Sequence, residues 1–91
     1  MNKAELAGHV AAETSVNKAT AERLVSAVFS AITDALARDD EVAIAGFGKF
    51  ANRSRPARQG RNPQTGEPVA IAASTVPSFK AAKALRDAVN G

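Results

Sequence analysis

The sequence predicts an α+β protein with two N-terminal helices, a three-stranded antiparallel sheet with a long β-ribbon arm, and a short C-terminal helix. Three observations support this fold class. Apolar residues recur every three or four positions in the first 40 residues, which is typical of helices. Beyond them, segments in which apolar and polar residues alternate are separated by turns that contain glycine or proline, which is typical of strands. Helices and strands therefore form separate runs, an order that favours α+β over α/β.

The N-terminal half is predicted to form two helices. Asn2 offers an N-cap for a helix over residues 3–13, although Gly8 weakens that helix by about 1 kcal/mol relative to alanine. The pattern breaks at residues 15–17, and a longer helix follows over residues 18–38. Its apolar stripe is too extensive for the first helix to cover, so we expect part of it to pack against a second chain.

The C-terminal half is predicted to form three strands and a final helix. Residues 41–45 alternate as a strand, residues 49–55 form the next strand after a glycine-rich bend, and residues 69–76 return as the third. Pro77 then leads into a short helix over residues 80–90.

The 91 residues are expected to form one domain, because the chain is too short for two. Within it we expect a helical dimerisation part at 1–40, a sheet at 41–79 and a C-terminal helix at 80–91. Four phenylalanines without Trp or Tyr make a light core, which favours an obligate dimer. The residues expected in the dimer core are Leu24, Val28, Phe29, Ile32, Leu36, Val42, Ile44, Phe47, Phe50 and Phe79.

The most informative segment is residues 53–68, which holds four arginines, one acid and almost no bulky apolar side chain. Such a segment cannot bury itself, so it must project into solvent or onto a polyanion. Arg53 and Arg55 alternate with small residues as on one face of a strand, and residues 62–66 have the composition of a tight turn. The pattern predicts a protruding two-stranded ribbon, here called the arm (residues 53–76), with Pro63 at its tip.

Charge is distributed unevenly along the chain. Residues 1–41 carry four basic and seven acidic side chains, a net charge of −3, whereas residues 42–91 carry eight basic and two acidic ones, a net +6. This asymmetry indicates a polyanionic partner for one face of the protein.

Composition also argues against several classes. The chain has no cysteine, and its single His9 cannot build a metal cluster alone, so we expect neither a metal nor a cofactor. No nucleophile, base and pocket residues combine into a catalytic pattern, so we expect no enzyme. The N-terminus lacks the apolar run of a signal peptide, and no stretch is long and apolar enough to span a membrane, which favours the cytoplasm.

Among polyanions, duplex DNA fits best. Single-strand and RNA binders stack bases on aromatic side chains, and the four phenylalanines all occupy predicted core positions outside the basic segment. RNA is therefore the weaker alternative. Pro63 shapes the tip turn whether or not it contacts DNA. The residues alone leave open whether its rigid ring also inserts between base pairs and kinks the duplex.

Four segments carry a resemblance to a known family. The most specific is Gly60-Arg-Asn-Pro-Gln-Thr-Gly-Glu67, and it is supported by Gly46-Phe-Gly-Lys-Phe50, Val76-Pro-Ser-Phe79 and Lys83-Ala-Leu-Arg-Asp-Ala-Val89. With them the chain resembles the HU/IHF family of bacterial histone-like proteins along essentially its whole length. The tip sequence favours the HU type over the sequence-specific IHF type.

The resemblance implies an intertwined homodimer, or a heterodimer with a paralogue, whose two arms wrap the minor groove while Pro63 wedges between base steps. It implies nucleoid organisation by bending and compacting DNA with low sequence specificity. Bent, nicked or gapped DNA should be preferred, because less bending energy is then required. The DNA-binding residues implied are Lys3, Arg53, Arg55, Arg58, Arg61, Asn62, Pro63, Gln64, Thr65, Lys80, Lys83 and Arg86. The alternatives are an IHF-like sequence-specific bender and a module whose basic arm docks on an acidic protein.

Overall fold

The computed structural model describes residues 1–91 and confirms the α+β class. The chain divides into two compact units, Met1–Arg38 and Asp39–Gly91. The first unit is entirely helical, and the second contains every strand and the last helix. The elements in chain order are α1 (Lys3–Thr14), α2 (Lys18–Ala37), β1 (Val42–Ile44), β2 (Gly48–Arg55), β3 (Arg58–Arg61), β4 (Pro68–Ile71), β5 (Ser74–Ala81) and α3 (Lys83–Asn90).

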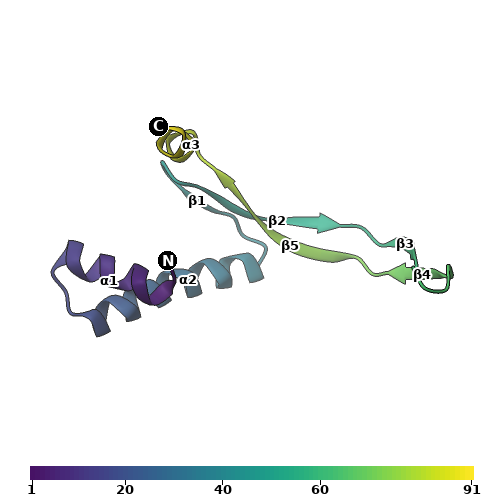
Figure 1. The fold of residues 1–91 in the computed structure, drawn as a ribbon, viewed down its shortest axis with the longest axis horizontal. Coiled ribbons are helices and arrows are strands. Elements are labelled where there is room, and N and C mark those ends of the chain that lie inside the picture. The colour runs from purple at the N-terminus through teal and green to yellow at the C-terminus, as the bar shows by residue number, and fades with distance from the viewer. The chain divides into compact units, whose positions relative to one another are not determined.

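Helices α1 and α2 form an antiparallel hairpin in the first unit (Figure 1). Both begin at an asparagine cap. The side-chain oxygen of Asn2 accepts from the Glu5 amide at 2.8 Å, and that of Asn17 accepts from the Thr20 amide, also at 2.8 Å. Each cap satisfies a first-turn amide that the helix itself leaves unpaired. Both predicted helices are confirmed to within one residue at their C-terminal ends.

The core of the helical unit is small. Ala7, Ala21 and Val25 form its buried centre, with Leu6, Val10, Ala11 and Val16 packed around them. Farther along α2 the apolar stripe is uncovered: Leu24 is 49%, Val28 56% and Phe29 45% exposed. A single chain therefore leaves large apolar side chains in contact with water, as the sequence indicated. Their burial by a second chain stays a prediction.

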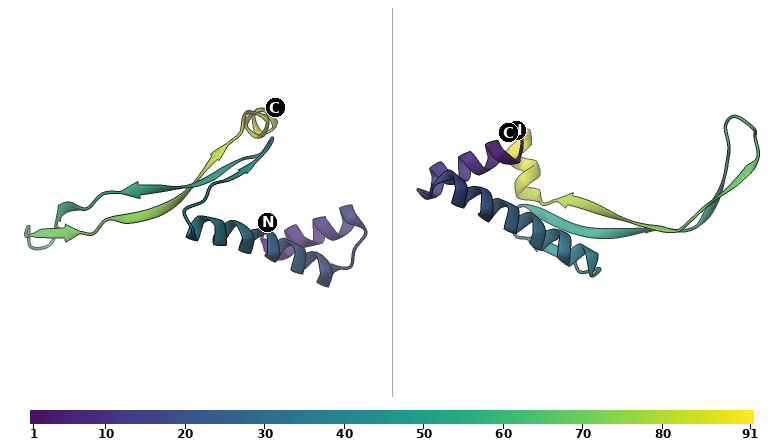
Figure 2. Two further views of the ribbon diagram at one scale, coloured as in Figure 1. Left: turned by 180° about the vertical axis from the view of Figure 1, so that it is seen from behind. Right: turned by 90° about the horizontal axis from the view of Figure 1, so that it is seen from below.

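The second unit contains a three-stranded antiparallel sheet in the order β1-β2-β5 and a two-stranded sheet of β3 and β4 (Figure 1). Strand β2 pairs with β5 from Gly48 opposite Ala81 to Arg55 opposite Ser74. Beyond a short break, β3 pairs with β4 from Arg58 opposite Ile71 to Arg61 opposite Pro68. The ribbon bends between the two pairs, as the right-hand view of Figure 2 shows.

The two faces of the three-stranded sheet differ in chemistry. Phe50 lies directly opposite Phe79, with ring centroids 4.8 Å apart, and Phe47 adds a ring 5.4 Å from Phe79. One position earlier on β2 and one later on β5, Lys49 lies opposite Lys80. Because successive residues of a strand point to opposite faces, the phenylalanines define an aromatic face and the lysines a cationic face.

Gly48 allows close packing on the aromatic face. It is buried, and a Cβ atom there would lie 2.5 Å from two atoms of the Phe79 ring and 2.6 Å from the Lys80 carbonyl oxygen. The Phe79 ring therefore packs directly on the β2 backbone, at a position that any side chain would occupy.

Two predicted boundaries are wrong. The third strand, predicted over 69–76, is split into β4 and β5, and the C-terminal helix begins at Lys83 instead of residue 80. Pro77 does not lead into that helix but lies within β5, opposite Asn52. Strand β5 is at the edge of its sheet, where a residue without an N–H group is tolerated. Pairing with β2 then extends the strand to Ala81.

Candidate nucleic-acid interface

A hydrogen-bonded turn forms the tip of the arm. The Gly66 amide donates to the Asn62 carbonyl at 2.7 Å, and the Asn62 amide donates to the Glu67 carbonyl at 2.8 Å. The Asn62 side chain also accepts from the Gln64 amide at 2.9 Å. Gly66 has a φ of +75°, which glycine adopts without the steric cost that other residues meet. The turn is therefore defined by Asn62 and Gly66, as the composition indicated.

Pro63 lies in this turn with its ring exposed. It has no N–H group to satisfy and a fixed φ, so the turn presents a compact, rigid apolar surface at the end of the ribbon. Gln64 and Thr65 beside it are also exposed, and the Thr65 hydroxyl accepts from the Glu67 amide at 3.3 Å. The predicted tip residues are thus brought together in one turn.

The four arm arginines are all exposed but do not share one face. Arg53 and Arg55 lie two residues apart on β2 and belong to the cationic face. Arg58 and Arg61 lie three residues apart on β3, so they point to opposite faces of the second ribbon. Arg61 also donates to the Gly66 carbonyl at 3.2 Å, which ties it to the tip turn.

None of these four arginines lies within ion-pair distance of an acid. The two salt bridges in the structure join Lys49 to Glu41 and Lys83 to Asp87 instead. Exposed cations without acidic partners, on both faces of the ribbon, produce a positive potential along it, which attracts an external polyanion.

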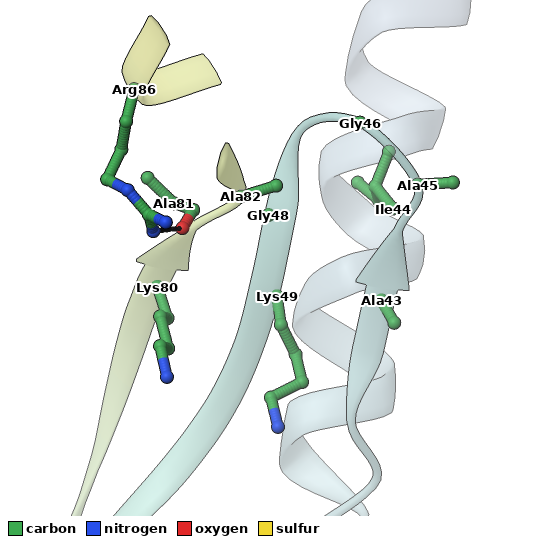
Figure 3. A pocket seen from close by; sticks show the side chains of 10 residues that line it. All are labelled: Ala43, Ile44, Ala45, Gly46, Gly48, Lys49, Lys80, Ala81, Ala82 and Arg86. Atoms are coloured by element: carbon green, nitrogen blue, oxygen red, sulfur yellow. Dashed lines mark hydrogen bonds between the residues drawn. The ribbon is translucent and has the colours of Figure 1, made fainter. Parts of the chain in front are cut away.

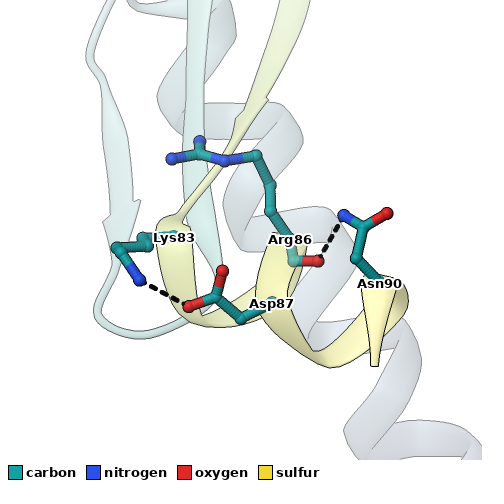
Figure 4. Close-up of polar contacts among 4 residues, drawn as sticks. All are labelled: Lys83, Arg86, Asp87 and Asn90. Carbon is teal, nitrogen blue, oxygen red and sulfur yellow. Dashed lines mark hydrogen bonds and ion pairs between the residues drawn. The ribbon is translucent and has the colours of Figure 1, made fainter.

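The remaining predicted cations of the second unit lie near the start of α3. Arg86 donates to the Ala81 carbonyl at 2.6 Å, which holds its side chain against the end of β5 (Figure 3). Lys83 donates to Asp87 at 2.6 Å one helical turn away (Figure 4). Lys80 belongs to the cationic face of β5. Lys3 is exposed in the first turn of α1, in the other unit, so it lies in a separate body from these residues.

One cation of the cationic face was missed in the sequence. Lys49 lies directly opposite Lys80 and two positions from Ala51, which precedes Arg53 on the same face. The two-residue alternation from Lys49 through Arg53 to Arg55 was the available signal. It was missed because Lys49 stands at the first position of the predicted strand, directly after the glycine-rich bend, and no register with the returning strand was predicted.

The structure contains no group of three or more His, Cys, Asp or Glu side chains that could hold a metal ion. None of its helices combines the length and hydropathy that crossing a bilayer requires. The fold and the arm together define a class of protein that carries an exposed arginine-bearing hairpin, a surface suited to contact with a polyanion.

Comparison with known proteins identifies the family. The sequence profile of the family described as bacterial DNA-binding protein matches residues 1–90, and the chain belongs to that family. The chain is 51% identical to the DNA-binding protein HU-beta of Escherichia coli K12 over 90 residues, which are 99% of this chain and 100% of that one. It is 54% identical to the DNA-binding protein HU of Geobacillus stearothermophilus over 89 residues, 98% of this chain and 99% of that one.

Solved structures share the fold. The HU–DNA cocrystal structure of Anabaena matches with a TM-score of 0.90 and 44% identity, covering 98% of this chain and 97% of that one. HU from Thermotoga maritima matches with a TM-score of 0.68 and 29% identity over 98% of both chains. The resemblance noted in the sequence to the HU/IHF family is thereby confirmed.

Proposed function

We propose that this protein is a histone-like architectural protein that binds duplex DNA with low sequence specificity, bends it and compacts the bacterial nucleoid. The observation that carries the proposal is the arm, whose exposed arginines have no acidic partner and whose tip presents Pro63. The relatives named as DNA-binding proteins, and the solved neighbour crystallised with DNA, support the same function.

Affinity comes mainly from phosphate contacts. Exposed Arg and Lys side chains neutralise phosphates and release condensed counterions, so log K falls against log salt with a slope of about −0.9 per phosphate. In the minor groove these side chains meet a pattern that distinguishes little beyond A·T from G·C. Binding is therefore expected to be strong at low salt and nearly independent of base order.

Bending comes from the tip. We propose that Pro63 inserts between base steps from the minor groove while Asn62, Gln64 and Thr65 contact the surrounding backbone. Such wedges kink a duplex by roughly 20–90°. Bending a site costs on the order of 1–6 kcal/mol, which the additional wrapped contacts offset. Nicked, gapped or bent DNA lowers that cost and is the expected preferred partner.

The working unit is proposed to be an intertwined homodimer. Leu24, Val28 and Phe29 are roughly half exposed in one chain, and covering them removes apolar surface from water at about 25 cal/mol per Å². Residues 1–40 would then supply most of the dimer contact, the sheet would supply the arm, and α3 would supply cations beside it. Sedimentation at low micromolar concentration should give twice the mass of the 9.4 kDa chain; a folded monomer would contradict the dimer.

The test of the function is a gel shift with several unrelated duplexes at 50 and 200 mM salt. We expect similar affinities for all of them and a steep loss at the higher concentration. A strong preference for one sequence would indicate an IHF-like reader. Failure to bind any duplex would favour a protein-interaction module, and tighter binding of competitor RNA would indicate an RNA-binding protein. In a cell, the proposed location is the nucleoid in the cytoplasm.

A further inference from the structure

We propose that Lys49 is a direct contact to the DNA backbone, in a phosphate-binding cluster, here called the base cluster, that it forms with Lys80 and Arg86, two residues that the family resemblance already implies. This inference rests on the proposed function and adds a contact residue to it. The cluster lies on the cationic face, at the end of the β2–β5 ladder that adjoins α3, opposite the end from which the arm extends.

The first argument is the strand register. Lys49 of β2 lies directly opposite Lys80 of β5, and side chains at such positions have Cβ atoms roughly 4.5–5.5 Å apart. Two like charges at that separation repel each other and destabilise the sheet. A bound anion between them would remove this repulsion, so the pair is better suited to a liganded state than to an empty one.

The charge of Lys49 is only weakly neutralised within the chain. Its nearest acid is Glu41, whose carboxylate oxygen lies 3.8 Å from the Lys49 ammonium, and both side chains are about half exposed or more. Ion pairs of this kind contribute little because water and salt screen them. A DNA phosphate can therefore replace Glu41 at small cost.

The second argument is the shape of the surface. Lys49, Lys80 and Arg86 line one hollow of about 470 Å³, whose other lining residues are mostly small, among them Ala43, Gly46 and Ala82. Figure 3 shows the Lys49 and Lys80 side chains extending alongside each other from β2 and β5, while the Arg86 guanidinium, from α3, lies beyond them at the Ala81 end of β5. The bond from Arg86 to the Ala81 carbonyl fixes its guanidinium there, and its remaining N–H groups stay available as donors.

The occupant is a duplex backbone because the base cluster is continuous with the arm. Lys49, Arg53 and Arg55 all belong to the cationic face of β2. Between Lys49 and Arg53 the face carries only Ala51 and Ser78, and the Ser78 hydroxyl donates to the Ala51 carbonyl at 2.9 Å. Small side chains let an extended polyanion lie close to the strands from the base cluster to the arm, which a small isolated anion would not exploit.

The experiment measures the binding of one random-sequence duplex by fluorescence anisotropy between 50 and 200 mM salt. Lys49→Gln should lower the log–log salt slope by about 0.9 for each copy of the base cluster that engages DNA, and each such loss should lower the affinity at 50 mM salt by roughly tenfold. Lys49→Arg should restore both values. Glu41→Gln should strengthen binding, an effect that mere damage to the fold would not produce.

The matched control is Lys18→Gln, which removes one exposed positive charge from the first turn of α2. It should leave the slope unchanged. If Lys49→Gln gives the same slope as the unaltered protein, or weakens binding of RNA competitor alone, the inference is overturned while the proposed function stands. If the unaltered protein binds no duplex, the proposed function itself fails.

Discussion

The Gly66 amide and the Asn62 carbonyl are joined by a 2.7 Å hydrogen bond that closes the tip of the arm. Because both bonding groups belong to the backbone and Gly66 adopts a positive φ, the turn is rigid without using a bulky side chain. Pro63 is consequently held outward at the end of a ribbon that has no other apolar group at its tip.

Replacement of Pro63 by alanine should separate bending from affinity. The arginines that neutralise phosphate remain, so Pro63→Ala should keep most of the salt-dependent binding, whereas the rigid wedge that unstacks a base step is lost. FRET between the ends of a short duplex measures the bend. Pro77→Ala makes the same change within β5, away from the tip, and should bend DNA as the unaltered protein does. Equal bending by Pro63→Ala would exclude the wedge.

Removal of arm arginines should weaken binding without changing specificity. Arg55→Ala and Arg58→Ala should each lower affinity for all duplexes alike and reduce the salt slope by about 1 for each arm that loses a phosphate contact. Salt titrations on three unrelated sequences check this. Arg23→Ala, on the exposed surface of α2, is the control for charge alone. A loss confined to one sequence would show base readout instead.

Two glycine substitutions should change stability in opposite directions. Gly48→Ala places a methyl group 2.5 Å from the Phe79 ring and 2.6 Å from a backbone oxygen, and overpacking of this kind costs about 1–3 kcal/mol. Gly8→Ala meets no atom within 4 Å and should stabilise α1 by roughly 0.5–1 kcal/mol. Urea unfolding at one fixed protein concentration measures both, since dimerisation makes stability concentration-dependent. A Gly48→Ala midpoint equal to that of the unaltered protein would show that the sheet tolerates the added methyl group.

Neutralising Asp87 should strengthen DNA binding. Its carboxylate holds the Lys83 ammonium at 2.6 Å, and both side chains are more than half exposed, so the pair contributes at most about 1 kcal/mol to folding. Asp87→Asn should therefore leave the unfolding midpoint nearly unchanged. It should raise duplex affinity a few-fold at low salt, because Lys83 no longer has to break an ion pair with Asp87 before it contacts a phosphate. Asp34→Asn, an exposed acid on α2, is the control. Unchanged affinity in Asp87→Asn would place Lys83 outside the interface.

The helices were predictable because their signals are local. Asn2 and Asn17 cap them through side-chain bonds to residues three positions away, and such chemistry can be recognised in a short window of sequence. The C-terminal boundary was not predictable in this way. Pro77 is a helix-initiating signal locally, yet pairing with Asn52, distant in sequence, keeps it in a strand. Long-range pairing overrides local preference there.

The arm was predictable from composition, because a segment with four arginines and few apolar residues has no place in a core. Its register was not. Only the pairing of β2 with β5 shows that Lys49 and Lys80 are direct neighbours on the cationic face. The division of Arg58 and Arg61 between the two faces of β3 likewise follows from strand alternation once the strand is known to be continuous.

The ladder of the ribbon is interrupted once, where Pro56 and Ala57 on one strand face Ala72 and Ala73 on the other, outside both strand pairs. Because strand pairing is missing at this place and intact on either side, the break is where we expect the direction of the outer segment to change most easily. Such a hinge would let an arm of one shape follow grooves of differing width and path. This property suits a ligand whose geometry varies along its length.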